Sequence, residues 1–460
     1  MLARAGPDVI GTYGLLMVYT GIVASFFYFG GDAVVIKFVP ALPRENRLSF
    51  LVSYAAVVLA FVAVGVAAAA VWPRGLQYIF GDRGGTKFQL EMLCLSPIYV
   101  LFSLVVAAHK AVLDMRWAHL LVRLLTIGSF LIYAFLYVAD RTLLVNHSTG
   151  LVWGIYLGLT GLAAIIGTTH LMELGEWRSQ LSRLTLHLPP GFWHYTLTTE
   201  QVSAVTFLFQ RLDLILIMNL GGLAALGRYI AVLTIADSLR AATRFFVDTL
   251  LPSLTNIIAT GNPAAASQVV TMNLRLLLLV DLIGMGGLIL LIDPILHLFG
   301  TRYADLRTVS FLLVMFYGLA APGGVGGSVL SAAGKQLYSF WAYVAQIILF
   351  STLFAALWPR WQLQGAILAN GIAALSASLL VLALARWKSG VHFAGYRDYL
   401  VFVGIGSAAC AMVMQERFSG FPAGLAIWSA SIGFLLWSRD YRVSECKQFL
   451  GCVFPMPERL

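Results

Sequence analysis

Apolar runs of 18 or more residues recur along the whole chain, and this feature constrains the fold more than any other. As a helix, each run is long enough to cross about 30 Å of hydrocarbon. The runs do not alternate apolar and polar residues as the strands of outer-membrane barrels do. With 60% hydrophobic and only 11% charged residues, the chain lies far from soluble globular proteins. It is therefore expected to be an all-α, polytopic transmembrane bundle.

The apolar runs and the polar or turn-forming residues that separate them predict thirteen spans. They lie near 11–36, 48–72, 88–109, 117–138, 150–171, 195–219, 228–251, 270–298, 308–332, 337–358, 364–385, 399–415 and 421–438. No connection between them is long enough for a separate domain. The longest includes RSQLSRLTLHLPP (178–190), where leucines interleave with polar residues, which indicates an interfacial helix or elbow, or a plain loop.

Lys and Arg residues gather in loops on one side if the C-terminal tail is cytoplasmic, so a multi-pass inner-membrane protein in that orientation is expected. The formal charge of +9 is interpreted as contact with membrane lipids rather than nucleic acid. The four cysteines have no metal-ligand spacing, and no metal or other cofactor is expected.

An internal repeat connects the start of the chain to its middle. RAGPDVIGTYGLLMVYTGIVASFFYFGGD (4–32) aligns without gaps to LGGLAALGRYIAVLTIADSLRAATRFFVD (220–248). The identities pair Gly6 with Gly222, Gly11 with Gly227, Tyr13 with Tyr229, Phe29 with Phe245 and Asp32 with Asp248. Six spans separate the copies, so the repeat is parallel, with its pseudo-twofold axis along the membrane normal.

The repeat divides the chain into lobes. We expect an N-terminal lobe of five spans (1–177), an interfacial linker (178–194), a C-terminal lobe of six spans (195–385), and two additional spans with a cytoplasmic tail (386–460). The second lobe begins with a span, 195–219, whose counterpart would precede Met1. The first lobe is thus expected to be one helix short, through an internal start or in a truncated, nonfunctional relative.

Ionisable residues inside the spans are costly and usually face a partner or a hydrated cavity. Asp237, Arg240, Arg244 and Asp248 share one helical face, at i, i+3, i+7 and i+11. Further ionisable groups in the apolar runs are Arg123, Arg211, Asp213, Arg275 and Asp281. Two interpretations stay open: internal salt bridges, or a hydrated cationic cavity whose arginines grip phosphate.

Proline and glycine interrupt another span. APGGVGG (321–327) places Pro322, Gly323 and Gly324 in the middle of 308–332. Proline removes a backbone hydrogen bond and glycine loosens a helix, so a kink or hinge is expected. Close packing of helices at the glycines is an equally good explanation.

Several stretches taken in order resemble one family. They are RAGPDVIGTY, IKFVP, FLFQRLDLILIMNLGGLAALGRYIAV, LLPSLTNI and VLSAAGKQLYSFW, within residues 1–385. Together they resemble the polysaccharide-flippase (Wzx-like) branch of the MOP exporter superfamily, from which this chain departs by lacking the first span. The resemblance implies two six-helix bundles around a central cavity, alternating access, and export of undecaprenyl-pyrophosphate-linked oligosaccharide, with polymerase or export machinery as possible partners.

The expected substrate contacts are Arg240, Arg244, Arg211 and Arg123. Asp213, Asp237 and Asp281 are candidates for counter-ions or for coupling to a cation gradient. Two alternatives stay open: a cation-coupled antiporter of the MATE type, for which an excess of unpaired carboxylates is expected, and an O-antigen polymerase or ligase. An enzyme is disfavoured because the sequence shows no large catalytic loop and no nucleophile–base arrangement.

Overall fold

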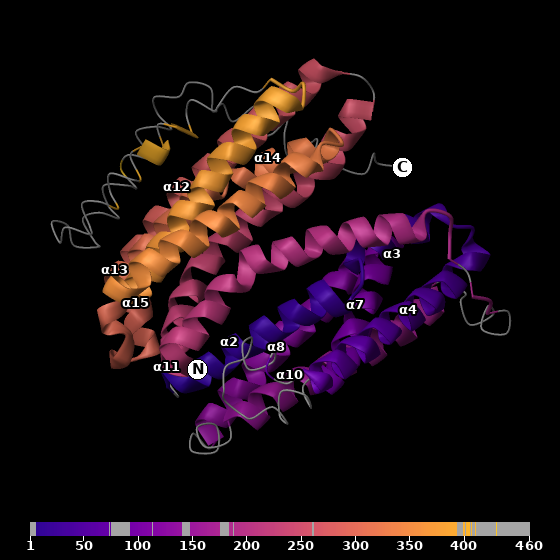
Figure 1. The fold of residues 1–460 in the computed structure, drawn as a ribbon, viewed down its shortest axis with the longest axis horizontal. Coiled ribbons are helices and arrows are strands. Elements are labelled where there is room, and N and C mark those ends of the chain that lie inside the picture. The colour runs from indigo at the N-terminus through magenta and orange to yellow at the C-terminus, as the bar shows by residue number, and fades with distance from the viewer. Residues whose placement is uncertain are drawn as a thin grey trace, which may run out of the picture. The chain divides into compact units, whose positions relative to one another are not determined.

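A computed structural model gives the fold (Figure 1). It describes residues 6–72, 74, 93–112, 114–139, 148–174, 184–186, 188–259 and 262–392, with scattered positions from 399 to 429. Every regular element in these ranges is a helix, which confirms the all-α prediction. Eight of the described helices are long and apolar enough to cross a membrane. A count of helices is not a count of membrane crossings, so the prediction of thirteen spans stays untested.

The chain divides into two compact units, Met1–Arg228 and Tyr229–Leu460. The first contains α2 (Pro7–Ile22), the π-helix η1 (Val23–Phe27), α3 (Gly31–Ala41), α4 (Arg44–Val71), α7 (Ser96–Ala111), α8 (Met115–Ala139), α10 (Ser148–Leu174) and the first part of α11 (Phe192–Ala259). α7 is central in this unit, since it packs against α3, α4, α8 and α10.

The predicted span 11–36 is two helices, because the chain breaks after η1. Gly30 and Gly31 have φ angles of 81° and 62°, which favour glycine. The backbone groups freed by the break find side-chain partners. The Tyr54 hydroxyl donates to the carbonyl oxygens of Phe29 (2.6 Å) and Gly31 (3.2 Å), and the Gly30 amide donates to a Glu200 carboxylate oxygen at 2.9 Å. The break is therefore stable within the bundle.

The repeat predicted from sequence has a structural counterpart. Gly6 and Gly222, aligned above, both have positive φ angles, 141° and 74°. Gly222 breaks α11 where the sequence predicts a loop, but the break is a kink without a separate turn segment. A Cβ atom on Gly11 would overlap the Leu223 carbonyl oxygen, and one on Gly227 would overlap the Pro7 carbonyl oxygen. Since Pro7 aligns with Leu223, the two contacts are reciprocal in the alignment.

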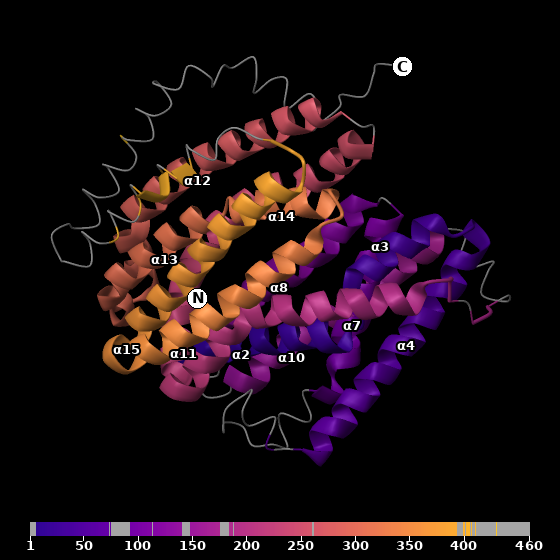
Figure 2. The same cartoon turned by 45° about the horizontal axis from the view of Figure 1, so that its top comes forward.

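The second unit contains the remainder of α11, α12 (Pro263–Phe299), the short helix η3 (Thr301–Leu306), α13 (Arg307–Ala320), α14 (Gly323–Ala332) and α15 (Gln336–Lys388). Figure 2 shows α15 alongside α13 and α14, in agreement with its contacts to both helices. The Tyr399 hydroxyl bonds Ser378 Oγ (2.9 Å) and donates to the Leu319 carbonyl (2.8 Å). Tyr399 thus joins the chain beyond α15 to this bundle.

α15 is a helical hairpin. At about 1.5 Å per residue its 53 residues would be far longer than a bilayer is thick. Gln362 has a φ of 44° and interrupts it. The Lys335 amine, just before α15, donates to the carbonyl oxygen of Lys388 at its end. The two arms therefore run in opposite directions and correspond to the predicted spans 337–358 and 364–385.

The glycine-rich segment interrupts its span, as expected. α13 ends at Ala320, and α14 begins at Gly323 after a turn that contains Pro322. The glycines also pack closely. A Cβ atom on Gly323 would lie 2.8 Å from Ser378 Oγ, and one on Gly324 would lie 2.8 Å from Val247 Cγ2. The break and the close packing therefore coexist, while a hinge motion here stays a prediction.

Two predicted segments lie largely outside the described residues. Of the linker 178–194, the described residues 184–186 and 188–190 are non-helical, and Leu186 is 86% exposed. Most of the spans 399–415 and 421–438 and of the tail fall outside the described part of the chain.

Candidate functional site

The first unit holds Arg211 among tyrosines. Arg211 is half-buried on α11, and its side chain packs beside Gly21 of α2. A Cβ atom added to Gly21 would lie 3.4 Å from Arg211 Cγ. The phenols of Tyr13 on α2 and Tyr99 on α7 lie within electrostatic range of the Arg211 guanidinium. Tyr156 on α10 lies within electrostatic range of both of these phenols. We call Arg211, Tyr13, Tyr99 and Tyr156 the Arg211 cluster.

All four members of the Arg211 cluster are half-buried, so each keeps part of its surface accessible. They come from four helices, α2, α7, α10 and α11. A guanidinium donates several hydrogen bonds from one plane, and each phenol both donates and accepts one. The cluster can therefore bind an anionic or hydroxyl-rich group. Its net character is cationic.

Two other sequence candidates lie in this unit. Asp213 is buried on α11, and one of its carboxylate oxygens accepts a hydrogen bond from the Leu214 amide at 2.8 Å. Arg123 is exposed on α8. The structure gives no contact that would bring Arg123 into the Arg211 cluster.

In the second unit, Arg240 and Asp237 form part of the predicted charged face of α11. Arg240 Nη1 lies 3.7 Å from Asp237 Oδ1, and its guanidinium carbon lies 4.8 Å from the centre of the Tyr317 ring on α13. Arg240 remains 43% exposed in this arrangement. It therefore combines the predicted internal pair with an accessible cation held over an aromatic ring.

The rest of that charged face is less defined. Arg244 is exposed one turn after Arg240. The side chain of Asp248, its expected partner, and that of Gln210 lie outside the described side chains. The Arg244–Asp248 pair therefore stays a prediction.

Asp281 on α12 is fully buried, and neither of its carboxylate oxygens has a hydrogen-bond partner within the described structure. It lies on the buried face of α12 with Leu277, Leu278 and Met285. Burial of an unpartnered carboxylate charge costs several kcal/mol. Binding of a proton or cation by Asp281 would neutralise this charge and remove that cost. The three sequence-predicted aspartates therefore lie in three different environments.

The sequence pattern did not indicate the tyrosines, because within the apolar spans only charged residues stand out. Tyr13, Tyr99, Tyr156 and Tyr317 lie in apolar runs, where an aromatic residue carries no distinctive signal. The one hint was Tyr13, which the repeat pairs with Tyr229. Tyr229 is buried, and its hydroxyl accepts a hydrogen bond from Asn370 at 3.1 Å.

Known proteins were compared with the chain by sequence and by structure. No protein-family model matches the sequence, and no curated protein does. Solved structures do match. An inward-facing multidrug-resistance MATE transporter of the MOP superfamily has a TM-score of 0.63 and 12% identity, and the match covers 84% of this chain and 92% of that one.

Two further structures share the fold. The lipid II flippase MurJ, in an inward closed conformation, has a TM-score of 0.62 and 13% identity, over 93% of this chain and 96% of that one. A MOP-superfamily transporter from Pyrococcus furiosus, described by the reversed polarity of its binding pocket, has a TM-score of 0.58 and 13% identity, over 84% and 89% of the two chains. The chain therefore has the fold of MOP-superfamily transporters. Identities this low carry no substrate with them.

Proposed function

We propose that this protein is a membrane transporter that flips an undecaprenyl-pyrophosphate-linked oligosaccharide across the inner membrane for polysaccharide export. The task is physical and breaks no covalent bond. A glycan and a diphosphate must cross hydrocarbon while the lipid tail stays in the bilayer. A cationic path that opens alternately to the two sides would lower that barrier.

The observation that carries this proposal is the Arg211 cluster. A half-buried arginine binds phosphate oxygens with two parallel hydrogen bonds and keeps its charge at physiological pH. The phenols of Tyr13, Tyr99 and Tyr156 add hydroxyl partners and flat apolar faces, which suit sugar rings. An organic cation, by contrast, would be repelled by the arginine.

Arg240 supports the same chemistry in the second unit, because it stays accessible while Tyr317 and Asp237 orient it. Arg244 and Arg123, both exposed, complete the proposed substrate contacts. Asp281 is the proposed coupling group. Asp213 and Asp237 are proposed as counter-ions, since each interacts with a neighbouring group on its own helix.

One observation suits a second candidate equally well, a cation-coupled antiporter of the MATE type. Asp281 is a buried carboxylate without a partner, as a group that binds a transported cation or proton requires. The same residue also serves a flippase driven by a cation gradient. The two candidates therefore differ in substrate and not in coupling.

The proposal is tested with purified full-length protein in proteoliposomes. A fluorescent lipid-linked oligosaccharide is placed in both leaflets, and its movement is followed by quenching from outside. We expect Arg211→Gln and Arg240→Gln each to slow translocation at least tenfold, since a charge-assisted contact contributes about 1.5–3 kcal/mol. Arg302→Gln, an exposed arginine on η3, is the matched control and keeps the wild-type rate.

A parallel assay measures efflux of a fluorescent organic cation driven by a proton or sodium gradient. Wild-type efflux of the cation without glycan translocation would replace the flippase by the antiporter. Glycan translocation that is unaffected by both arginine substitutions would remove the Arg211 cluster and Arg240 from the substrate path.

A further inference from the structure

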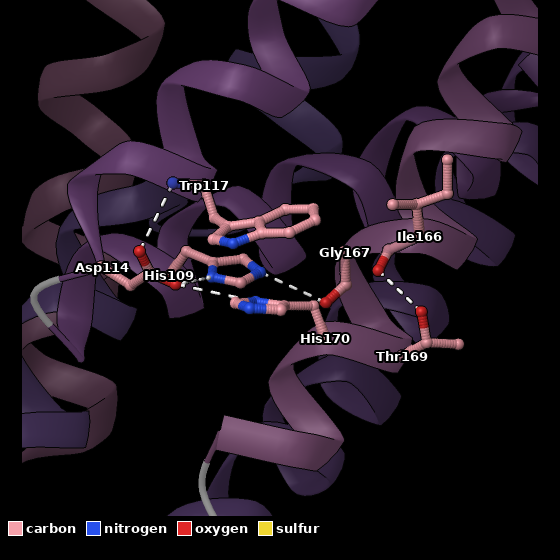
Figure 3. A network of polar contacts seen from close by, with 7 residues as sticks. All are labelled: His109, Asp114, Trp117, Ile166, Gly167, Thr169 and His170. Carbon is pink, nitrogen blue, oxygen red and sulfur yellow. Dashed lines mark hydrogen bonds and ion pairs between the residues drawn. The ribbon is translucent and has the colours of Figure 1, made fainter.

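One corner of the first unit brings together two histidines and a carboxylate, shown in Figure 3. His109 lies near the end of α7, Asp114 in the turn that leads into α8, and His170 in the last turns of α10. Trp117, in the first turn of α8, lies over both imidazole rings. The neighbouring Lys110 is already paired with Asp32 at 2.7 Å, so its charge is balanced.

Two of the three distances in this cluster are close to those of a tetrahedral metal site. His109 Nδ1 lies 3.2 Å from Asp114 Oδ2, and His170 Nδ1 lies 3.6 Å from the same oxygen. All three ligand atoms lie within 4.8 Å of one another. Two atoms that each lie 2.0–2.1 Å from a tetrahedral zinc ion are about 3.3 Å apart. An ion can therefore be bound with small rotations of the side chains.

The hydrogen bonds of His109 indicate where its lone pair points. His109 Nε2 lies 3.2 Å from the Gly167 carbonyl oxygen, and a carbonyl oxygen only accepts, so Nε2 carries the hydrogen. In the neutral ring, Nδ1 then presents its lone pair to the Asp114 carboxylate. Two acceptors face each other unless a proton or a metal ion lies between them. A carbonyl that fixes the tautomer of a ligand histidine is a common outer contact in zinc sites.

Asp114 and His170 also have atoms available for binding an ion. Asp114 Oδ1 accepts a hydrogen bond from the Trp117 amide at 3.4 Å, which leaves Oδ2 for the cluster. His170 Nδ1 is a buried atom with no hydrogen-bond partner within the described structure. The His170 ring is stacked on Trp117 with 3.9 Å between ring centroids. The stack holds the imidazole with Nδ1 near the carboxylate.

We propose that His109, Asp114 and His170 bind a divalent transition-metal ion of the zinc type. Nδ1 of each histidine and Oδ2 of Asp114 are the protein ligands, and a water molecule completes the tetrahedron. The ion joins the α7–α8 turn to α10 four residues before that helix ends at Leu174. Its role is to stiffen this corner, independently of the transported substrate.

Metal binding is measured with untagged, full-length protein in detergent after treatment with a chelator. Zn²⁺ is titrated in competition with a chromophoric chelator, and Co²⁺ absorption reports the coordination geometry. We expect one equivalent of Zn²⁺ at micromolar or tighter affinity, a tetrahedral Co²⁺ spectrum, and no response to Mg²⁺.

The variants separate binding from folding. His170→Ala and Asp114→Asn are chosen because both residues are partly exposed, and each is expected to weaken Zn²⁺ binding at least tenfold. His119→Ala, on the exposed face of α8, is the matched control and binds as wild type. Size-exclusion profiles and helicity verify that the variants fold.

Three results would overturn the proposal. They are no Zn²⁺ binding by the wild type, binding that survives both His170→Ala and Asp114→Asn, and a thermal midpoint that responds to pH but not to Zn²⁺. The last result would show that a proton alone occupies the cluster.

Discussion

At the scale of single residues, two kinds of close packing define this structure: glycines against backbone carbonyl groups, and large side chains around a charge. Gly11 and Gly227 are the clearest case, since each lies against a carbonyl oxygen in the segment that aligns with its own. The Arg211 cluster shows the opposite need, in which large side chains from four helices lie in one region around a single charge. Both arrangements depend on the exact approach of helices, and each leads to a test by substitution.

Gly227→Ala is expected to destabilise the protein by about 1–3 kcal/mol, because the new methyl group overlaps the Pro7 carbonyl. Gly158→Ala on α10 is the control, since a Cβ atom there meets nothing within 4 Å. Removing a glycine from inside a helix favours the fold by about 0.5–1 kcal/mol, so the control is expected to shift the other way. Thermal unfolding in detergent, followed by tryptophan fluorescence, measures both. Equal shifts would contradict the close crossing.

Asp281→Asn is expected to leave the thermal midpoint unchanged or to raise it, since the substitution removes a carboxyl group that has no partner. It is also expected to abolish the dependence of transport on a cation gradient. Thermal unfolding and gradient-driven transport in proteoliposomes are measured side by side. A large loss of stability together with normal coupling would mean that Asp281 is structural.

At the scale of elements, α15 and its neighbours show how a long apolar stretch becomes two helices. The reversal occurs at Gln362, whose φ of 44° is unfavourable for a residue with a Cβ atom. Nothing in the local sequence WQLQG marks Gln362 rather than the nearby Gly365 as the turning point. Gly365 lies instead against the backbone of Leu357, where a side chain would not fit.

Gln362→Gly is therefore expected to stabilise the protein by about 0.5–1 kcal/mol, because glycine adopts positive φ without strain. Gln364→Gly, two residues later in the helical arm, is expected to destabilise it by about 1 kcal/mol. The two variants make the same chemical change at nearby positions, so the sign of the difference in thermal midpoint tests the reversal directly. Identical signs would place the turn elsewhere.

The attachment of the chain beyond α15 is a second test at this scale. Tyr399→Phe removes the hydroxyl that bonds Ser378 and the Leu319 carbonyl. Loss of this buried hydroxyl is expected to cost about 1–3 kcal/mol, since polar partners are left unsatisfied. The exposed Tyr338, changed in the same way, is the control. A Tyr399→Phe midpoint equal to that of Tyr338→Phe would show that this attachment adds no stability.

At the scale of the whole molecule, the distribution of basic residues predicts a cytoplasmic C-terminus. Within the units, Lys335 donates to the carbonyl oxygen of Lys388 and Lys110 pairs with Asp32. Fluorescence of a green fluorescent protein fused to the C-terminus, which folds only inside the cell, is expected. Activity of a periplasmic phosphatase fused there would reverse the orientation.

The sequence by itself determined the all-α class, and it predicted the positions of the spans and a repeat. Apolar runs of membrane length can satisfy their backbone groups only as helices in lipid. Gly6 and Gly222 both have a positive φ angle, a conformation that favours glycine and can be anticipated from the aligned sequence without knowledge of contacts. The charged candidates Arg240 and Asp237 were also found correctly as a pair, because i, i+3 spacing on one helix needs no tertiary information.

Only the tertiary structure decided which helices approach one another. Tyr13 and Tyr99 lie within electrostatic range of Arg211 on two other helices, and no local spacing connects them. The same is true of His109, Asp114 and His170, a cluster that the sequence analysis did not find. A pattern along the chain reports neighbours on one helix, whereas these groups meet through packing between elements far apart in sequence. Packing therefore placed both sites.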